Sequence, residues 1–158
     1  MGRNETKEKL RRPLTLATLI AGLILTAGLV GLTWWPVVNS VESGLSSEYP
    51  EIQPAILPFP VHLVRARALE AIEARSDWEL IEAGAEVVSY RARGPGLTPD
   101  AQVTARLEGR EGTTVVWVRS ENLEGAGDFG QNARNISAFL NALDSALEFA
   151  EPQTTRAP

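Results

Sequence analysis

The sequence predicts an α+β protein: one N-terminal transmembrane helix, followed by a small antiparallel sheet packed by two helices. Three patterns lead to this fold class. The 25 residues from Leu14 to Val38 carry no charge, which is long enough for a membrane span. Residues 102–108 alternate between apolar and polar side chains, as a strand with one buried face does. Residues 136–147 place apolar side chains three and four positions apart, as an amphipathic helix does.

The apolar segment has the features of a membrane anchor. Twenty-five helical residues rise roughly 37 Å, against a hydrocarbon core of about 30 Å. Trp34 and Trp35 stand where indole rings favour the membrane interface, and Pro36 then ends the helix. A cleaved signal peptide also begins with basic residues, but its apolar region is shorter and ends in small residues. We therefore favour an uncleaved anchor.

The charge distribution predicts the orientation. Residues 2–12 contain five bases and two acids, a net charge of +3, while 18 acids and 10 arginines beyond Ser40 give −8. The positive-inside rule places the N-terminus in the cytoplasm. The predicted organisation is a cytoplasmic basic segment at 1–13, a transmembrane helix at 14–38, a tether rich in Ser, Gly and Glu at 39–49, an extracytoplasmic α+β domain at 50–150, and a disordered tail at 151–158.

The anchor contains a candidate interface for other membrane helices. Ala27 and Gly31 form a pair of small residues four positions apart, a spacing that allows another helix to approach closely. Trp34 and Trp35 extend this candidate surface to the end of the segment.

The remaining elements follow from periodicity. Prolines limit Ile52–Phe59 to an extended or edge strand. The expected elements after it are a helix from 61 to about 76, strands at 78–81, 87–93, 102–108 and 113–120, and the final helix. Asp128 is a candidate N-cap for that helix, with Gln131 able to reach back to it. Two helices on one face of a meander would bury both apolar stripes.

Composition excludes several functions. The chain has no cysteine and one histidine, His62, so zinc sites of the usual nitrogen and sulfur type are excluded. A Ser-His-Asp triad could use only His62, which we interpret as a surface or capping residue. The acidic domain lacks the basic face that nucleic acid requires. We predict no catalytic residue, no metal site, no cofactor and no nucleic-acid partner.

One group of polar residues is a candidate site. Its members are Asp100, Arg106, Arg119, Asp128 and Asn132. Arg106 and Arg119 are expected on the same face of paired strands, where arginine forks would bind a carboxylate or phosphate. The alternative is structural: an ion pair, a turn and a helix cap. We favour the structural interpretation.

A second candidate is an apolar cavity between sheet and helices. Its walls would be Trp78, Tyr90, Trp117 and Phe139, and it would suit a lipid or pigment. A domain of this size more often fills such a space with its own side chains, which is the interpretation we favour.

The stretch VRSENLEGAGDFGQNARNISAFL, with YPEIQP upstream, resembles a family of uncharacterised, membrane-anchored bacterial proteins, the domain of unknown function 1499. The matching positions are Arg119, Ser120, Gly125, Asp128, Gly130, Asn132 and Ile136. The chain departs from the family pattern at Ala101, Asn122, Leu123 and Asn135, where charged or polar family positions are replaced. The resemblance implies a fold and no activity.

These observations predict a non-catalytic accessory or scaffold subunit of a larger membrane complex, whether respiratory, photosynthetic or envelope. Its expected place is the bacterial inner membrane, single-pass, with the C-terminal domain periplasmic. Expected partners are the lipid bilayer and other membrane protein subunits. The alternative is a membrane-tethered binding domain for a lipid or other apolar ligand. A hydrolase or transferase using Asp100, Arg119 and Asp128 is the least favoured hypothesis.

Overall fold

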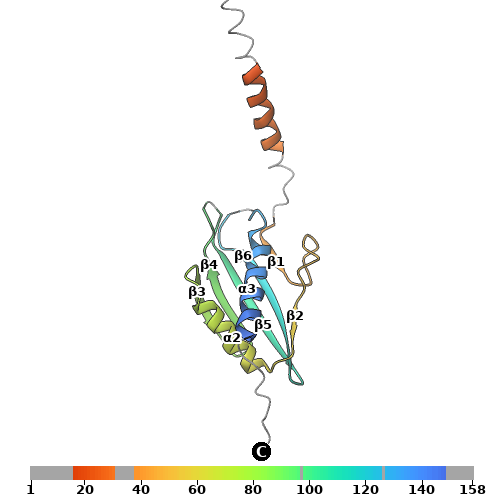
Figure 1. The fold of residues 1–158 in the computed structure, drawn as a ribbon, viewed down its shortest axis with the longest axis vertical. Helices are drawn as coiled ribbons and strands as arrows, with labels where there is room; N and C mark the ends of the chain where they lie inside the picture. The colour runs from red at the N-terminus through yellow and green to blue at the C-terminus, as the bar shows by residue number, and fades with distance from the viewer. Residues whose placement is uncertain (1–15, 31–37, 97, 126, 149–158) are drawn as a thin grey trace, which may run out of the picture. The chain divides into compact units, whose positions relative to one another are not determined.

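The chain divides into two units, Met1–Pro36 and Val37–Pro158. The computed structural model describes residues 16–30, 38–96, 98–125 and 127–148. The first unit contributes one described helix, at residues 16–30. The second unit is an α+β domain (Figure 1).

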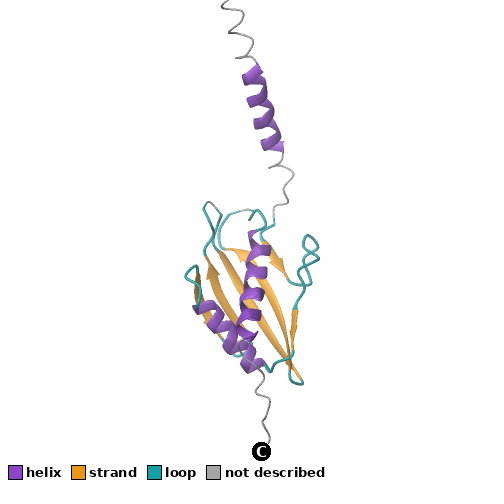
Figure 2. Cartoon of the chain, viewed as in Figure 1, coloured by secondary structure: helices purple, strands orange, loops and turns teal. Residues whose placement is uncertain are grey.

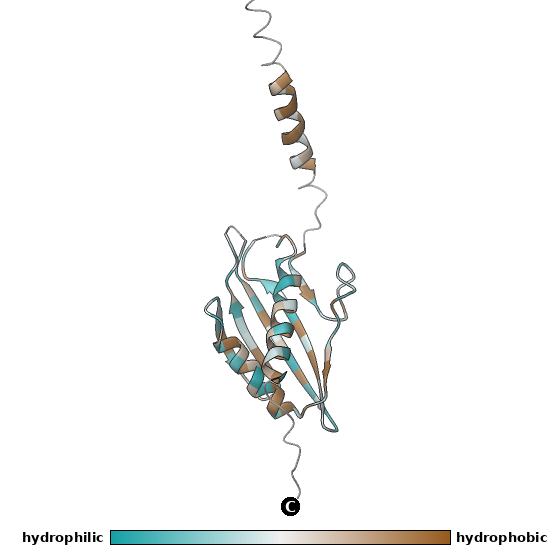
Figure 3. Ribbon diagram, in the orientation of Figure 1, coloured by the Kyte–Doolittle hydropathy of each residue, from teal (hydrophilic) through white to brown (hydrophobic). Residues whose placement is uncertain are grey.

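The helix of residues 16–30 is apolar on all sides. Every one of its side chains is exposed, and Figure 3 shows it in the colours of hydrophobic residues. Its large apolar side chains are Leu16, Leu19, Ile20, Leu23, Ile24, Leu25, Leu29 and Val30, each between 48% and 72% exposed. The Thr26 hydroxyl donates to the carbonyl of Gly22 at 2.8 Å, so the helix itself satisfies this polar group.

Within the described ranges, no helix combines the length and the apolar character needed to cross a membrane. The predicted span of 14–38 is described as helix only at residues 16–30. Gly31, Trp34 and Trp35 lie outside the described residues, as do the predicted basic segment 1–13 and tail 151–158.

The domain contains a six-stranded antiparallel sheet and two helices (Figure 2). The strands are β1 (Ser40–Glu42), β2 (Ala55–Leu57), β3 (Trp78–Ala83), β4 (Val87–Ala92), β5 (Ala101–Arg110) and β6 (Thr113–Asn122), and the helices are α2 (Val61–Glu73) and α3 (Gln131–Glu148). The strand order is β1-β6-β5-β4-β3, and β2 also pairs with β6. The predicted α+β class and the four-strand meander are therefore confirmed.

The core lies between the two helices and one face of the sheet. Alternate residues of β5, namely Val103, Ala105 and Leu107, are almost fully buried, as the sequence pattern predicts. The neighbouring strands add Val88, Tyr90, Val116 and Val118, and the helices add Val64, Ala68, Ile72, Ile136, Phe139, Leu143 and Leu147. The predicted stripe on the last helix is therefore its core-facing side.

The predicted tether at residues 39–49 is wrong at its start. Residues Ser40–Glu42 form β1, which pairs with β6, and Val41 and Ser43 are fully buried. A single apolar residue among Ser and Glu gives no strand periodicity, so the pairing depends on a partner strand distant in the sequence. The domain therefore begins about ten residues earlier than the sequence predicts.

Two helix limits also differ from the prediction. Helix α2 ends at Glu73 rather than near Ser76. The Ala74 N–H makes the last bond to a residue four positions back, Glu70, and the Arg75 N–H then bonds to Ile72 three positions back as the chain turns toward β3. Strand β2 is the predicted edge strand but covers only three residues, since Pro54 and Pro58 flank it.

Candidate functional site

The five predicted polar residues do not form one site. Arg106 and Arg119 lie on the face of the sheet opposite the helices, which we call the outer face. Asp128 and Asn132 lie at the start of α3, on the helix side, and Asp100 lies in the loop before β5. The prediction that the two arginines share a face of paired strands is confirmed, because Thr104 pairs with Arg119 and Arg106 pairs with Trp117.

The outer face carries a shallow groove of about 400 Å³. Its lining residues are Glu42, Val87, Thr104, Arg106, Trp117, Arg119 and Glu121. The guanidinium carbon of Arg106 lies 5.7 Å from the centre of the Trp117 ring, within the range of a cation–π contact. The indole nitrogen of Trp117 is buried and has no hydrogen-bond acceptor among the described residues. The groove therefore combines two cations and two carboxylates.

Both arginines of the groove already contact carboxylates. Arg119 Nη2 lies 2.7 Å from Glu121 Oε2, and its Nη1 lies 4.0 Å from Glu42. Arg106 Nη1 lies 3.4 Å from Glu108. A carboxylate or phosphate ligand would have to compete with these side chains, so the arrangement fits the structural interpretation better than an anion site.

Asp100 closes the loop between β4 and β5. Its Oδ1 accepts the Gly94 N–H at 2.9 Å, and its Oδ2 lies 3.0 Å from Arg91 Nε. A side chain at Gly94 would collide with the carbonyl of Thr98, so the loop passes too close to itself for any larger residue. Asp100 thus holds a tight turn and contributes nothing to the groove.

Asp128 caps α3, as the sequence predicts, although it lies three residues before the first residue of the helix rather than directly before it. Its two carboxylate oxygens accept the backbone N–H groups of Gly130 at 2.9 Å and Asn132 at 2.6 Å. Gln131 does not reach back; its side chain bonds to Asn135 and Arg134 instead. The helix begins at Gln131, so the carboxylate satisfies one donor of its first turn, the Asn132 N–H, and the N–H of Gly130 just before it.

Glycine is required in this turn. Gly130 has φ +77°, a conformation that costs other residues energy. A Cβ there would also lie 3.3 Å from Arg134 and 3.4 Å from the Tyr49 hydroxyl. Burial raises the pKa of Tyr49, and the nearby Asp128 carboxylate raises that pKa further.

Asn132 joins α3 to the sheet through a buried polar cluster. It accepts a hydrogen bond from the Ser120 hydroxyl at 2.7 Å, and its Nδ2 donates to the Asn39 carbonyl and to Asn122 Oδ1 at 3.1 and 3.0 Å. Asn135 Nδ2 donates to the Ser120 hydroxyl at 3.3 Å. Asn132 and Ser120 are fully buried. These bonds give both buried side chains partners in place of water, which is a structural role.

Asn39 and Ser120 were not among the residues predicted for a polar site, although both belong to this cluster. A signal was present for Ser120, since Val116 and Val118 precede it at alternate positions and point to the core. A polar residue that continues an inward-facing series needs a buried partner. No comparable pattern marks Asn39.

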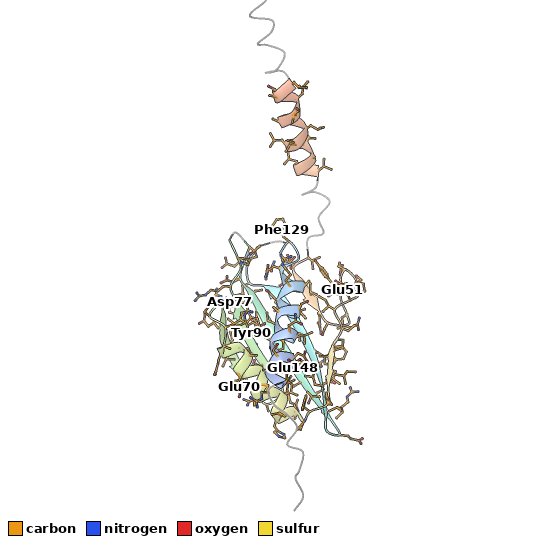
Figure 4. All side chains as sticks on the ribbon, in the orientation of Figure 1. Glu51, Glu70, Asp77, Tyr90, Phe129 and Glu148 are labelled. Atoms are coloured by element: carbon orange, nitrogen blue, oxygen red, sulfur yellow. The ribbon has the colours of Figure 1, made fainter. Side chains whose placement is uncertain are left out.

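The four residues predicted as cavity walls lie on two different faces. Trp78, Tyr90 and Phe139 stack in the core with ring centres 4.5 to 6.4 Å apart, whereas Trp117 belongs to the outer face. Figure 4 shows Tyr90 in the middle of the domain. Its hydroxyl is buried without a hydrogen-bond partner among the described residues, and burial raises its pKa far above the usual value. The three rings pack against one another on the helix side of the sheet.

The geometry defines an α+β domain with two helices on one face of an antiparallel sheet, in which a buried polar cluster of Asn132, Asn135 and Ser120 ties the last helix to the last strand. A family model described as "Protein of unknown function (DUF1499)" matches residues 33–143. The chain belongs to this family, as the turn motif predicts. Of the residues that carry the resemblance, Asp128 and Gly130 build the turn that caps α3, and Ser120 and Asn132 belong to the buried cluster.

Among solved structures, three loosely similar chains have TM-scores below 0.5. CalU16 from Micromonospora echinospora has a TM-score of 0.46 at 14% identity, over 65% of this chain and 76% of that one. Ara h 8.0201 has 0.42 at 11% identity, over 69% and 97%. TTHA0849 from Thermus thermophilus has 0.40 at 13% identity, over 72% and 99%. No curated protein matches the chain. These likenesses carry no argument about function.

Proposed function

We propose that this chain is a membrane-anchored, non-catalytic accessory or scaffold subunit of a larger membrane protein complex. It would reside in the bacterial inner membrane, with the N-terminus cytoplasmic and the α+β domain periplasmic. The observation that carries the proposal is the helix of residues 16–30, whose apolar side chains are exposed on every side.

A helix of this kind needs apolar surroundings. Helices of water-soluble domains have one apolar stripe, whereas a helix that is apolar all round is buried in a large protein or in a membrane. Full burial of a Leu, Ile or Val side chain gains up to about 1.5–3 kcal/mol of transfer free energy, so eight such side chains that are 48–72% exposed strongly favour apolar surroundings. The uncharged run extends beyond the described helix on both sides, from Leu14 to Val38, which supports lipid as the surroundings.

The non-catalytic part of the proposal is supported by the dispersal of the polar residues. The aspartates and arginines that a hydrolase would need lie on two sides of the sheet and in a separate loop, each bonded to its own partners. The alternative function, binding of an apolar ligand, would require the stacked rings of Trp78, Tyr90 and Phe139 to separate.

Membrane retention tests the anchor. The full chain is expressed, and membranes are washed at alkaline pH, which removes peripheral proteins. We expect the wild-type chain to stay in the pellet and the Leu23→Lys/Ile24→Lys variant to appear in the wash. The matched control is Leu45→Lys, because Leu45 is 69% exposed and Leu23 is 72% exposed, but Leu45 lies in the α+β domain. Equal retention of the wild type and the double variant would refute the anchor.

Association tests the scaffold role. After extraction in mild detergent, we expect a particle heavier than one chain plus its detergent. Ala27→Leu should reduce this association, because Ala27 belongs to the predicted close-approach surface. The control is Ala21→Leu, which lies about 120° away around the same helix. A particle with the mass of a single chain, unchanged by either variant, would contradict the proposal.

A further inference from the structure

Strand β3 forms an open edge of the sheet, as Figure 1 shows. Among the residues that the structure describes, it pairs with β4 and with no other strand. Residues 79–83 are all exposed, including the apolar Leu80 at 39% and Ile81 at 54%. The opposite edge is formed by β1 and β2, which have only three residues each. Very short strands protect an edge, whereas the six residues of β3 present a row of backbone groups to another chain.

The backbone of Leu80 faces this open edge. At the start of the strand pair, the Asp77 carbonyl accepts the Arg93 N–H at 3.0 Å. Successive residues of an antiparallel strand face the partner strand and the other side in turn. Glu79 therefore faces β4, and the N–H and C=O groups of Leu80 face the edge. A further strand could bond to Leu80 without disturbing the pairing of β3 with β4.

A β-bulge places two glutamates on the same face of β3. The register of the β3–β4 pair shifts at Ile81, which is the extra residue. Glu79 then lies opposite Arg91 and Glu82 lies opposite Ser89, two β4 residues that share the outer face. Without the bulge, residues three positions apart would point to opposite faces. The open edge therefore carries both carboxylates on its outer side.

The strand and its flanking turns are acidic. Residues 77–86 contain four acids and no base. Four arginines of neighbouring segments lie around the strand: Arg65 is bonded to the carbonyls of Ala83 and Gly84, Arg75 is paired with Asp77, Arg91 is paired with Asp100, and Arg93 lies opposite Asp77. Within the described ranges, no ion pair joins Glu79 or Glu82 to a base. These two carboxylates are therefore available to basic groups of an added strand.

The same charges favour a basic partner over a second copy of this chain. Pairing β3 with β3 of another copy would bring four glutamates into one short ladder, and like charges opposite each other are destabilising. An extended segment with Lys or Arg at alternate positions would instead place bases opposite the glutamates, and pairs of opposite charge stabilise a ladder. Main-chain bonds to the edge would supply affinity, and the alternate side chains would supply specificity.

We infer that the β3 edge accepts an extended, basic segment of a partner protein, which pairs with the backbone of Leu80 and extends the sheet. The inference rests on the proposed scaffold role, and it names the surface and the class of partner for that role. The contact lies within the α+β domain alone.

Photo-crosslinking of the full chain in its native cell tests the surface. Benzoylphenylalanine, a photoreactive residue, takes the place of Ile81 or, as the matched control, of Ile56, which is 73% exposed and lies in β2 at the opposite edge. We expect several-fold more adduct from position 81 than from position 56. Mass spectrometry should find Lys or Arg at alternate positions in the cross-linked segment of a different protein.

Charge reversal tests the class of partner. Glu79→Lys/Glu82→Lys should abolish the adduct from position 81, because bases would then oppose bases. The control is Glu111→Lys/Glu148→Lys, which makes the same change of net charge at exposed positions elsewhere and should leave the adduct unchanged.

Hydrogen exchange tests for strand pairing. In the complex purified in mild detergent, the amides of residues 79–82 should exchange several-fold more slowly than in the chain alone, since the Leu80 N–H gains an acceptor. The amides of β2 should not change. An adduct without slower exchange would mean that the partner contacts side chains only, and strand addition would be wrong.

Three other results would overturn the inference: equal adducts from positions 81 and 56, an adduct that contains only peptides of this chain, or an adduct that survives the charge reversal. The mass of the detergent-extracted particle separates this failure from failure of the proposed function. A particle heavier than one chain, without an adduct at position 81, leaves the scaffold role standing and removes the β3 edge as its surface. A particle with the mass of a single chain, without an adduct, removes both.

Discussion

Ser120 and Arg119 are neighbours in β6, and they show how differently the two faces of this sheet treat polar groups. Ser120 points toward α3, is fully buried, and bonds to Asn132 and Asn135. Arg119 points the other way, and its side chain is 50% exposed beside Glu121. Two consecutive residues of β6 therefore belong to a solvated ion pair and to a buried cluster with fixed partners.

Polar residues on the two faces are expected to contribute unequally to the stability of the fold. A buried donor or acceptor that loses its partner costs about 1–3 kcal/mol, whereas an exposed ion pair contributes about 0–1 kcal/mol. The helix face should therefore respond strongly to substitution and the outer face weakly. If the outer face is instead the more sensitive one, it must contribute to something other than the fold.

The largest effect is expected for Phe139→Ala on the helix face. Phe139 is fully buried, with its ring centre 5.7 Å from Tyr90 and 6.4 Å from Trp78. Removing the ring leaves a cavity, and we expect the free energy of unfolding to fall by about 3–5 kcal/mol in denaturant titration. Phe129→Ala is the matched control, an exposed phenylalanine whose loss should cost about 0.5 kcal/mol or less. Similar losses in the two variants would contradict the assignment of the core.

A smaller loss is expected for Asn132→Ala. The substitution leaves the Ser120 hydroxyl, the Asn39 carbonyl and the Asn122 side chain with fewer partners. We expect the free energy of unfolding to fall by about 1–3 kcal/mol, measured as for Phe139. Asn141→Ala, at an exposed position of the same helix, should change it little. An unchanged midpoint for Asn132→Ala would show that the cluster adds no stability.

Asp128→Ala removes the cap at the start of α3. Two backbone N–H groups then lose their acceptor, and we expect a loss of about 1 kcal/mol, seen as a lower thermal midpoint. Asp128→Asn should lose less, because an amide oxygen can still accept one of the bonds. The two variants also separate a cap from a catalytic carboxylate, since a carboxylate needed for chemistry would be as sensitive to Asn as to Ala.

Much of the domain was predictable because its patterns are local. The alternation in β5 and the stripe in α3 each identify a buried face without knowledge of any partner. The cap at Asp128 is local as well. Strand β1 was not predictable, because its three residues become a strand only by pairing with Arg119, Ser120 and Glu121.

The candidate site was predicted less well for the same reason. Placing Arg106 and Arg119 on one face needs only the pairing of adjacent strands, and that prediction is confirmed. Grouping them with Asp128 and Asn132 failed, because it requires knowing which face of β6 the last helix covers. The buried side chain of Ser120 identifies the face of β6 that α3 covers. Arg119, the preceding residue in the strand, therefore lies on the opposite face.

The smallest effect is expected for Arg119→Ala on the outer face. Its partners Glu121 and Glu42 are themselves solvated, so the free energy of unfolding should fall by less than about 1 kcal/mol, with the difference shrinking further in high salt.

Trp117→Phe is the companion variant, because it removes the unpaired indole donor and keeps most of the apolar contact with the groove. If the full chain in native membranes loses complex assembly with either variant while its unfolding is unchanged, the outer face is a contact surface. If neither variant affects assembly, the polar residues of the outer face contribute little to stability and nothing to assembly. The groove is then only the solvated side of the sheet.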